Sequence, residues 1–460
     1  MTVEWTTLRE LLLPGTGRGR GLEGELREAV RTGRLRPGAR LPSSRDLAAQ
    51  LGVARGTVTA AYEQLVAEGY LVARRGSGTR VAETLAGAEA PAPDLDEPPR
   101  WRYDLRPGLP ALGHFPRQAW LAATRAALNA MPVSTLGYPE PCGLPELRVE
   151  LAGYLGRVRS VVAEPAGITI THGAAEALAL LAGVLHDRGH RAIAVENPSH
   201  PKQAGLLTLH GLRVVPVPVD RDGIRVDELA RTGCRAVLVT AAHQFPLGAA
   251  LAPGRRHALL AWARERDALV LEDDYDAEHR YDRPAISALQ ALDPSRVAYL
   301  GSVSKILAPA LRLGWVVLPA SLRAAVADRK RRTNMGCGPL PQAALARFLR
   351  EGHYDRHLRR TRLLYRRRRD ALLAALAEHR PSWRPVGIAA GLQLVVRLPD
   401  GADDVAVSER LAQAGIHAPA LSGYAHAPLP APYPGLVLGY AALSPDQLRE
   451  AVVAIPKNAT

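Results

Sequence analysis

The sequence has 460 residues, of which 47% are hydrophobic, and a formal net charge of +14. This length suggests about two to four domains, and the length and composition together allow a large buried core. Three cysteines are too few for a disulfide framework, so we expect a protein of the reducing cytoplasm. No apolar run reaches the roughly 18 residues of a membrane span, and we expect no signal peptide.

The first 82 residues are basic and have a helical pattern. They contain 13 Arg against 8 Asp and Glu, a net of +5 from 13 − 8. Apolar residues recur at helical spacing over 22–33, and this run ends at a glycine. Either Ser43 or Ser44 is suited to cap a short helix through Leu51, with a turn at Gly52.

A second helix is predicted from about Arg55 to Glu68, and the string YLVARRGSGTRV then predicts a basic β-hairpin. Two helices joined by a tight turn and followed by a hairpin are typical of a winged helix-turn-helix. We assign this domain to residues 15–82. Its strings LPSSRDLAAQLGVARGTV, EGYL and RGSGT resemble the GntR-type DNA-binding domain.

This resemblance implies that the helix over 55–66 enters the major groove, where base edges are read, while other residues contact phosphate or form the wing. It also implies a homodimer on a DNA operator with repeated half-sites, bound less tightly as salt rises. The residues expected to face DNA are Ser44, Arg45, Arg55, Thr57, Thr59, Arg75, Gly76 and Gly78.

Residues 83–102 are rich in Ala, Pro and acidic residues, which is typical of a linker. From 103 to 460, short β-rich runs alternate with longer helical runs, and this predicts an α/β domain with a mainly parallel sheet. The expected strands are 167–171, 192–196, 214–220, 236–240, 268–273, 297–302 and 313–319.

Lys305 is one of only four lysines in the chain, against 55 arginines. It follows the predicted strand 297–302, and ligands of parallel sheets bind at the carboxyl ends of strands. A primary amine there forms a Schiff base with an aldehyde, as pyridoxal phosphate requires, whereas a guanidinium does not. The sequence therefore predicts a pyridoxal phosphate site at Lys305 and no metal site.

The cofactor needs further partners, and the sequence offers them. Asp273 or Asp274 would protonate the pyridine nitrogen; only one of them fits, because neighbours in a strand face opposite ways. Tyr275 would hydrogen-bond the ring oxygen. The phosphate would be held by side chains around the lysine and by backbone amides at a predicted helix start. These phosphate partners are Ser302, Ser304, Arg312, Ala174 and Ala175.

From about 103 to 450 the chain resembles fold-type I aminotransferases, and specifically the effector domain of the MocR (GabR-type) regulators. The strings that carry the resemblance are LRPGLP, FPRQAW, LGYPEPCGLPELR, HQFPLG, EDDYDAEHRY and GSVSKILAPALRLGW. It implies a smaller C-terminal α+β subdomain, Asp273 as the pyridine partner, and Tyr138 reaching the phosphate of the partner subunit. His243 would line the pocket or order its loop, and Ser304 would bind phosphate or cap a turn.

The chain also departs from this family pattern. Ala175 and Glu176 replace a glutamine pair, and His200 takes the place of the aromatic residue that stacks on the ring. Lys202 and Val437 stand where two arginines would bind a substrate carboxylate, and Arg397 is another candidate for this contact. We therefore expect a regulator that senses pyridoxal phosphate and controls vitamin B6, amino-acid or amine metabolism. The alternative is an active aminotransferase with an attached DNA-binding domain.

Overall fold

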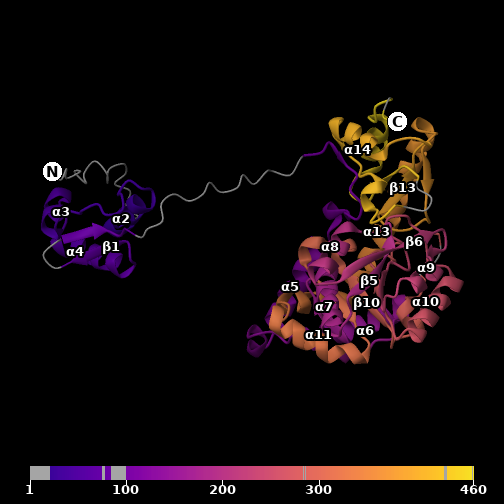
Figure 1. The fold of residues 1–460 in the computed structure, drawn as a ribbon, viewed down its shortest axis with the longest axis horizontal. Helices are drawn as coiled ribbons and strands as arrows, with labels where there is room; N and C mark the ends of the chain where they lie inside the picture. The colour runs from indigo at the N-terminus through magenta and orange to yellow at the C-terminus, as the bar shows by residue number, and fades with distance from the viewer. Residues whose placement is uncertain are drawn as a thin grey trace. The chain divides into compact units, whose positions relative to one another are not determined.

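The computed structural model describes residues 21–74, 78–83, 100–282, 284, 286–428, 433–457 and 459. The chain divides into two compact units, Met1–Pro99 and Arg100–Thr460, and each is described by itself (Figure 1). No helix within these described ranges is both long enough and apolar enough to cross a membrane.

The described residues of the first unit form three helices and a two-stranded antiparallel sheet. Its elements are α2 (Leu22–Arg31), α3 (Ser44–Leu51), α4 (Arg55–Ala67), β1 (Leu71–Arg74) and β2 (Gly78–Val81). Each element contributes buried apolar residues to one core, and these include Leu26, Leu47, Leu65 and Leu71. This arrangement is the predicted helix-turn-helix with a hairpin after it.

The second unit is built on a sheet of eight strands in the order β4-β11-β10-β9-β8-β5-β6-β7. The pairs formed by β5, β6, β8, β9 and β10 are parallel, whereas β7, β11 and β4 join antiparallel. The strands are β4 (Ile168–Thr171), β5 (Ala192–Asn197), β6 (Arg213–Asp220), β7 (Gly223–Ile224), β8 (Ala236–Val239), β9 (Leu269–Asp273), β10 (Val297–Ser302) and β11 (Gly314–Val317).

Helices cover this sheet and bury its apolar side chains. They are α5 (Arg117–Ala130), α6 (Pro145–Arg159), α7 (Ala174–Asp187), α8 (Pro201–Leu209), α9 (Val226–Arg231), α10 (Pro253–Glu265), α11 (Ala320–Thr333) and α12 (Pro339–Arg350). Because both faces are covered, β5 and β9 are continuous apolar runs up to the acidic residues at their ends.

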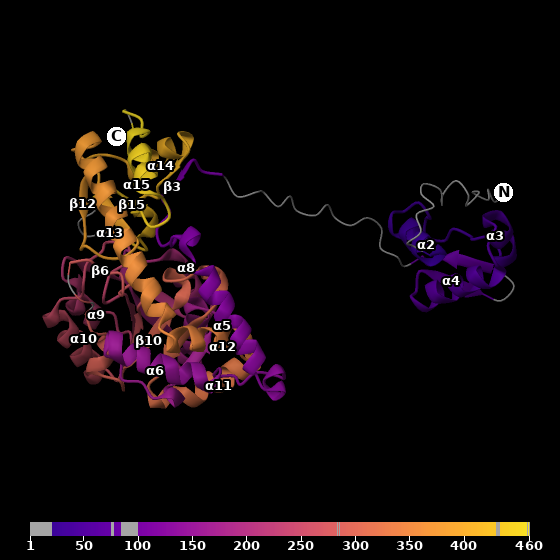
Figure 2. The ribbon, with the colours of Figure 1, turned by 180° about the vertical axis from the view of Figure 1, so that it is seen from behind.

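A smaller C-terminal part lies at one end of the second unit (Figures 1 and 2). It contains β12 (Arg384–Val386), β13 (Gln393–Arg397), β15 (Gly435–Gly439), α14 (Asp404–Gln413), α15 (Pro445–Val453) and the short pair β3 (Tyr103–Asp104) and β14 (Ile416–His417). The long helix α13 (His353–His379) packs Tyr354 in the core of the larger part and Leu372 in that of the smaller part.

The predicted architecture is confirmed, with a mixed sheet in which the parallel strands are central. The predicted strand at 313–319 is β11, which runs antiparallel between β4 and β10. The basic run at 359–376 lies within α13, where Tyr365, Arg368 and Leu372 are buried, so this run is a packed helix of the fold.

Candidate cofactor pocket and DNA-binding surface

A cavity of about 870 Å³ lies where β9 and β10 end, between the large and the small parts of the second unit. Its lining combines Lys305 and Asp273 from the sheet side with Tyr424 from the C-terminal part. It therefore occupies the carboxyl edge of the parallel strands, where the sequence predicts the site.

Lys305 lies in a short 3-10 turn, Val303–Lys305, directly after β10. Its Nζ donates to the carbonyl oxygen of Gly108 at 2.7 Å, and a Cβ on Gly108 would lie 2.8 Å from Nζ. Burial lowers the pKa of the Lys305 ammonium, against the opposing effect of Asp276 and Asp273. A lowered pKa increases the fraction of neutral amine, which is the nucleophilic form.

The two adjacent acids at the end of β9 point in opposite directions. Asp274 accepts from Arg159 Nε and from the Tyr299 hydroxyl, each at 2.7 Å, and does not line the cavity. Asp273 lines the cavity, and its Oδ1 is buried without a hydrogen-bond partner among the described residues. Burial raises the pKa of Asp273 to about 6. Asp273 is thus the acid placed to receive a pyridinium N–H.

Tyr275 also lines the cavity, and neighbouring side chains contact its hydroxyl group. Its hydroxyl oxygen accepts from Gln393 Nε2 at 2.9 Å and lies 3.0 Å from His243 Nδ1. The same Nδ1 lies 3.0 Å from an Asp276 oxygen. Because an ionised carboxylate only accepts, Nδ1 donates to Asp276, which leaves the Tyr275 proton available to a ligand. His243 itself is not part of the lining, so of its two interpretations the ordering of Tyr275 fits better.

The end of the cavity at the start of α7 is polar and cationic. Ala174 and Ala175 begin α7 there, after Gly173, whose φ is 105°. Ser302 and Ser304 also line this end, and the guanidinium of Arg312 makes no hydrogen bond or ion pair to another described residue. The Ser302 hydroxyl caps the turn by accepting from the Ser304 backbone N–H at 3.4 Å. The six lining residues offer amides, hydroxyls and a guanidinium to one anion.

Arg312 adopts a left-handed backbone conformation, with a φ of 50°. A non-glycine residue pays for this conformation in strain, and such residues cluster at functional sites. A Cβ on Gly173 would lie 3.5 Å from the Arg312 guanidinium. That distance is an ordinary contact, so glycine at 173 is required by its φ of 105° and not by the approach of the guanidinium.

The start of α8 forms one wall of the cavity. His200 caps this helix, with its Nδ1 accepting from the Lys202 backbone N–H at 3.2 Å, and its ring stacks on Phe245 at 5.4 Å. Three residues on, Gln203 donates to Asp273 Oδ2 at 2.5 Å. The sequence analysis missed Gln203, Phe245 and Tyr424. The i, i+3 spacing of His200 and Gln203 on one helix face was the available signal for Gln203.

Three residues singled out in the sequence lie away from the cavity. Tyr138 is 89% exposed and is not in the lining. Val437 is fully buried among apolar side chains that include Val395 and Leu421. Arg397, another candidate to bind a carboxylate, pairs with Asp400 at 2.6 Å and is also outside the lining. Of the two family positions that bind carboxylate, only Lys202 places a cation at the cavity.

Pyridoxal phosphate matches this set of residues. The cavity presents an amine at Lys305, an unpartnered buried carboxylate oxygen at Asp273, a hydroxyl at Tyr275 and an anion-binding end at Arg312. These groups correspond in kind to the aldehyde, the pyridine nitrogen, the ring oxygen and the phosphate of the cofactor.

The first unit carries the predicted DNA-binding residues on α3, α4 and β2. Arg45, Arg55 and Thr57 are exposed, and neither guanidinium is bonded to another described side chain. Thr59 is half-buried and donates to the Arg55 carbonyl at 3.0 Å. The cap of α3 is Ser43 rather than Ser44, which is half-buried in the first turn.

The hairpin is described except at its tip. Gly78 begins β2 with a φ of 82°, and a Cβ there would lie 3.3 Å from the Arg40 guanidinium. Arg75 and Gly76, the other predicted wing residues, lie outside the described residues. Gly78 therefore suits the start of the returning strand, where a left-handed conformation is needed.

One group of side chains has the composition of a metal site. His172, Glu176 and Cys337 bring their ligand atoms within 4.8 Å of one another. The buried ammonium of Lys330 pairs with Glu176 and lies 3.6 Å from Cys337 Sγ. Because a cation already lies against two of the three ligands, this group is a partly buried ion-pair cluster beside the start of α7.

Comparison with known proteins gives the same two parts. Residues 109–455 match the family model described as aminotransferase class I and II, and residues 19–81 match the one described as bacterial regulatory proteins, gntR family. The domain resembles the Pyrococcus horikoshii kynurenine aminotransferase in complex with PMP, with a TM-score of 0.71 and 25% identity over 78% of this chain and 91% of that one. An archaeal alanine:glyoxylate aminotransferase gives a TM-score of 0.70 and 27% identity, over 77% and 89% of the two chains.

Relatives that contain both parts are regulators. The probable rhizopine catabolism regulatory protein MocR of Rhizobium meliloti is 34% identical, covering 94% of this chain and 92% of its own. The pyridoxine biosynthesis transcriptional regulator PdxR of Corynebacterium glutamicum is 37% identical, covering 87% of each chain. The predicted family is confirmed: the chain belongs to the MocR/GabR-type transcriptional regulators, in which a GntR-type DNA-binding domain is joined to an aminotransferase-like domain that binds pyridoxal phosphate.

Proposed function

We propose that this regulator uses pyridoxal phosphate, bound in the cavity around Lys305, as the effector that changes its binding to DNA. The proposal rests on one observation. The cavity has a suitable residue for each part of the cofactor, but it lacks part of the residue set that would bind a substrate carboxylate. Lys305, Asp273, Tyr275 and Arg312 all line the cavity, whereas Val437 offers no charge to a substrate carboxylate.

The residues of the chain would divide the work as follows. When bound, the cofactor supplies an aldehyde that reacts with a primary amine. Lys305 provides that amine from a buried position, and Asp273 holds a proton on the pyridine nitrogen. Tyr275 orients the ring oxygen, and Arg312 with the start of α7 binds the phosphate.

Turnover of amino acids would need more than this. The substrate carboxylate must be held so that the proton to be transferred lies next to Lys305. A fork-shaped guanidinium holds a carboxylate well. Lys202 provides one exposed ammonium at the cavity, and Val437 provides none. We therefore propose a sensor ahead of the alternative, an efficient aminotransferase. Because the relative PdxR is a regulator of pyridoxine biosynthesis, vitamin B6 genes are the first candidate targets of this protein.

We also propose that the protein acts in the cytoplasm as a homodimer on paired half-sites. Tyr138 and Leu136 are exposed at 89% and 63%, as are apolar side chains nearby on α5 such as Leu121. Exposed apolar surface of this kind marks a protein interface. In a dimer, Tyr138 would reach the phosphate end of the partner subunit's cavity.

The first experiment titrates purified protein with pyridoxal phosphate alone and measures its binding to the DNA upstream of its own gene and the adjacent divergent gene. We expect specific binding whose affinity or footprint changes with the cofactor, and loss of that change in Lys305→Ala. Equal binding to random DNA at every cofactor concentration would contradict a sensor role, and amino donors would then be screened for turnover.

A further inference from the structure

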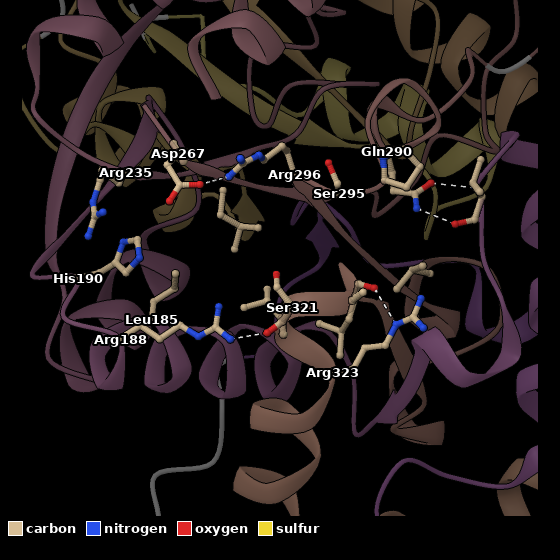
Figure 3. Close-up of a pocket in the computed structure, with 18 of the residues that line it drawn as sticks. Leu185, Arg188, His190, Arg235, Asp267, Gln290, Ser295, Arg296, Ser321 and Arg323 are labelled. Carbon is tan, nitrogen blue, oxygen red and sulfur yellow. Dashed lines mark hydrogen bonds and ion pairs between the residues drawn. The ribbon is translucent and has the colours of Figure 1, made fainter. Parts of the chain in front are cut away.

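A second cavity, of about 790 Å³, opens at the opposite end of the central sheet (Figure 3). Strands β8, β9 and β10 begin at this cavity and end at the pocket of Lys305. Arg235 directly precedes β8, and Arg296 directly precedes β10. At roughly 3.3 Å per strand residue, the two cavities lie on the order of 15–20 Å apart.

Backbone hydrogen bonds of the sheet hold the main chain of two arginines that line this cavity. The carbonyl oxygen of Arg235 accepts from Leu269 N at 3.0 Å, and that of Arg296 accepts from Val270 N at 2.9 Å. Both arginines therefore flank the first residues of β9. The sequence signal was an arginine immediately before each of two strands, and only the strand order shows that these two strands flank β9.

Two helices supply the other walls. Arg188 and His190 follow the end of α7, and Arg323 lies in the first turn of α11. Figure 3 shows Arg188, His190 and Arg235 on one side of the opening and Arg323 on the other. The lining thus has four guanidinium groups and one carboxylate, that of Asp267, a net of +3 from 4 − 1.

This charge is only partly compensated. Arg296 pairs with Asp267, and Arg323 lies 3.4 Å from Glu164. Arg188 donates to the Ser321 carbonyl. The guanidinium of Arg235 makes no hydrogen bond or ion pair with any residue that the structure describes. Burial, together with Arg235 and Arg188, lowers the pKa of His190, so this imidazole stays neutral and able to accept a hydrogen bond.

We propose that this cavity binds a small phosphorylated anion with at least two negative charges. Guanidinium groups bind phosphate oxygens in pairs, and four of them line this cavity. Apolar side chains, including Leu185 and Leu318, complete the lining and suit the organic part of such a ligand. The site is separate from the Lys305 pocket, so the proposal does not depend on the effector role of pyridoxal phosphate.

The test uses the full-length protein saturated with pyridoxal phosphate, so that the phosphate end of the first pocket is filled. Inorganic pyrophosphate and ADP are then titrated by calorimetry at constant ionic strength. We expect one pyrophosphate per chain in addition to the cofactor. Arg235→Gln should weaken pyrophosphate binding by about tenfold, because one charge-assisted hydrogen bond is lost.

Asp267→Asn is the opposing variant and should tighten pyrophosphate binding, because it removes the only carboxylate of the lining. Asp267 has a φ of 49°, a conformation that asparagine tolerates well. Arg331→Gln is the matched control, since Arg331 is on α11 but outside the cavity and its side chain is 61% exposed. Its affinity for pyrophosphate should stay unchanged.

Three results would overturn the proposal. One is the absence of pyrophosphate binding to the saturated protein, and another is an equal affinity in wild type, Arg235→Gln and Asp267→Asn. The third is displacement of pyrophosphate by duplex DNA without an operator, which would assign these arginines to the DNA backbone. Tighter binding of ADP than of pyrophosphate would support a ligand with an organic part.

Discussion

Nε2 of Gln203 lies 2.5 Å from Oδ2 of Asp273, so the carboxylate that faces the cofactor position is held by a side chain of α8. The second oxygen of Asp273 is buried and free of any partner among the described residues. One oxygen is thus fixed by the protein while the other is left for the ligand.

Gln203→Leu should weaken the binding of pyridoxal phosphate. A hydrogen bond to a charged group contributes about 1.5–3 kcal/mol, so the Kd should rise by roughly tenfold or more. Absorbance titration with the cofactor measures the change. Thr208→Ala, on the same helix but outside the cavity lining, is the control and should bind as wild type does. An unchanged Kd for Gln203→Leu would show that Asp273 needs no support from α8.

The binding of pyridoxal phosphate should weaken as pH falls from 7 towards 5. Burial raises the pKa of Asp273 to about 6 in the cofactor-free protein, and a bound pyridinium would lower it again. Protons on Asp273 therefore compete with the cofactor below about pH 6. Asp273→Asn should bind weakly and lose the part of the pH dependence centred near 6. Retention of that inflection in Asp273→Asn would assign it to another group.

The same carboxylate should lower the free energy of unfolding of the cofactor-free protein. A pKa raised from 3.8 in the unfolded chain to about 6 in the folded one means that folding favours the protonated form. This cost is absent below pH 4 and complete above pH 6, where it amounts to about 3 kcal/mol at most. Cofactor-free Asp273→Asn should thus melt above wild type at pH 7.5 and close to it at pH 4. A lower Tm than wild type at pH 7.5 would contradict this assignment.

Gly314→Ala should disrupt the phosphate end of the pocket. Its Cβ would lie 2.7 Å from the Cα of Gly173, a contact between backbones that no side-chain rotation relieves. We expect a loss of roughly 1–3 kcal/mol in the free energy of unfolding, with weaker cofactor binding. Gly205→Ala is the matched control: its Cβ meets open space within α8, and it should stabilise by about 0.5–1 kcal/mol. Urea unfolding of both variants checks the contrast.

Arg55→Ala should weaken specific DNA binding more than nonspecific binding. Arg55 is exposed at the start of α4, and a bidentate contact to a base discriminates by about 1–3 kcal/mol. Arg45→Ala should instead weaken binding to all sequences alike and reduce its salt dependence. Gel-shift titration on operator and random duplexes separates the two effects. A uniform loss in Arg55→Ala would move Arg55 to the phosphate-contacting residues.

The sequence by itself determined the two-part organisation and identified many of the residues that line the cavity. Alternating β-rich and helical runs were enough to predict the α/β domain, because parallel strands buried on both faces are continuous apolar runs. We identified Lys305, Tyr275 and Arg312 from residue type and immediate sequence context, because the cofactor needs an amine, a hydroxyl and a phosphate-binding guanidinium. The neighbours Asp273 and Asp274 remained equivalent until the resemblance separated them, and their hydrogen bonds in the fold agree with that choice.

Only the tertiary structure decided which distant residues meet. Gln203 reaches Asp273 across 70 positions of the chain, and His243 lies behind Tyr275 instead of in the lining. Arg235 and Arg296 become neighbours of one cavity only because β8 and β10 both pair with β9. Sequence periodicity reports which way a side chain faces within its own element. The order of strands and the packing of helices, which depend on contacts between remote segments, decide what that side chain touches.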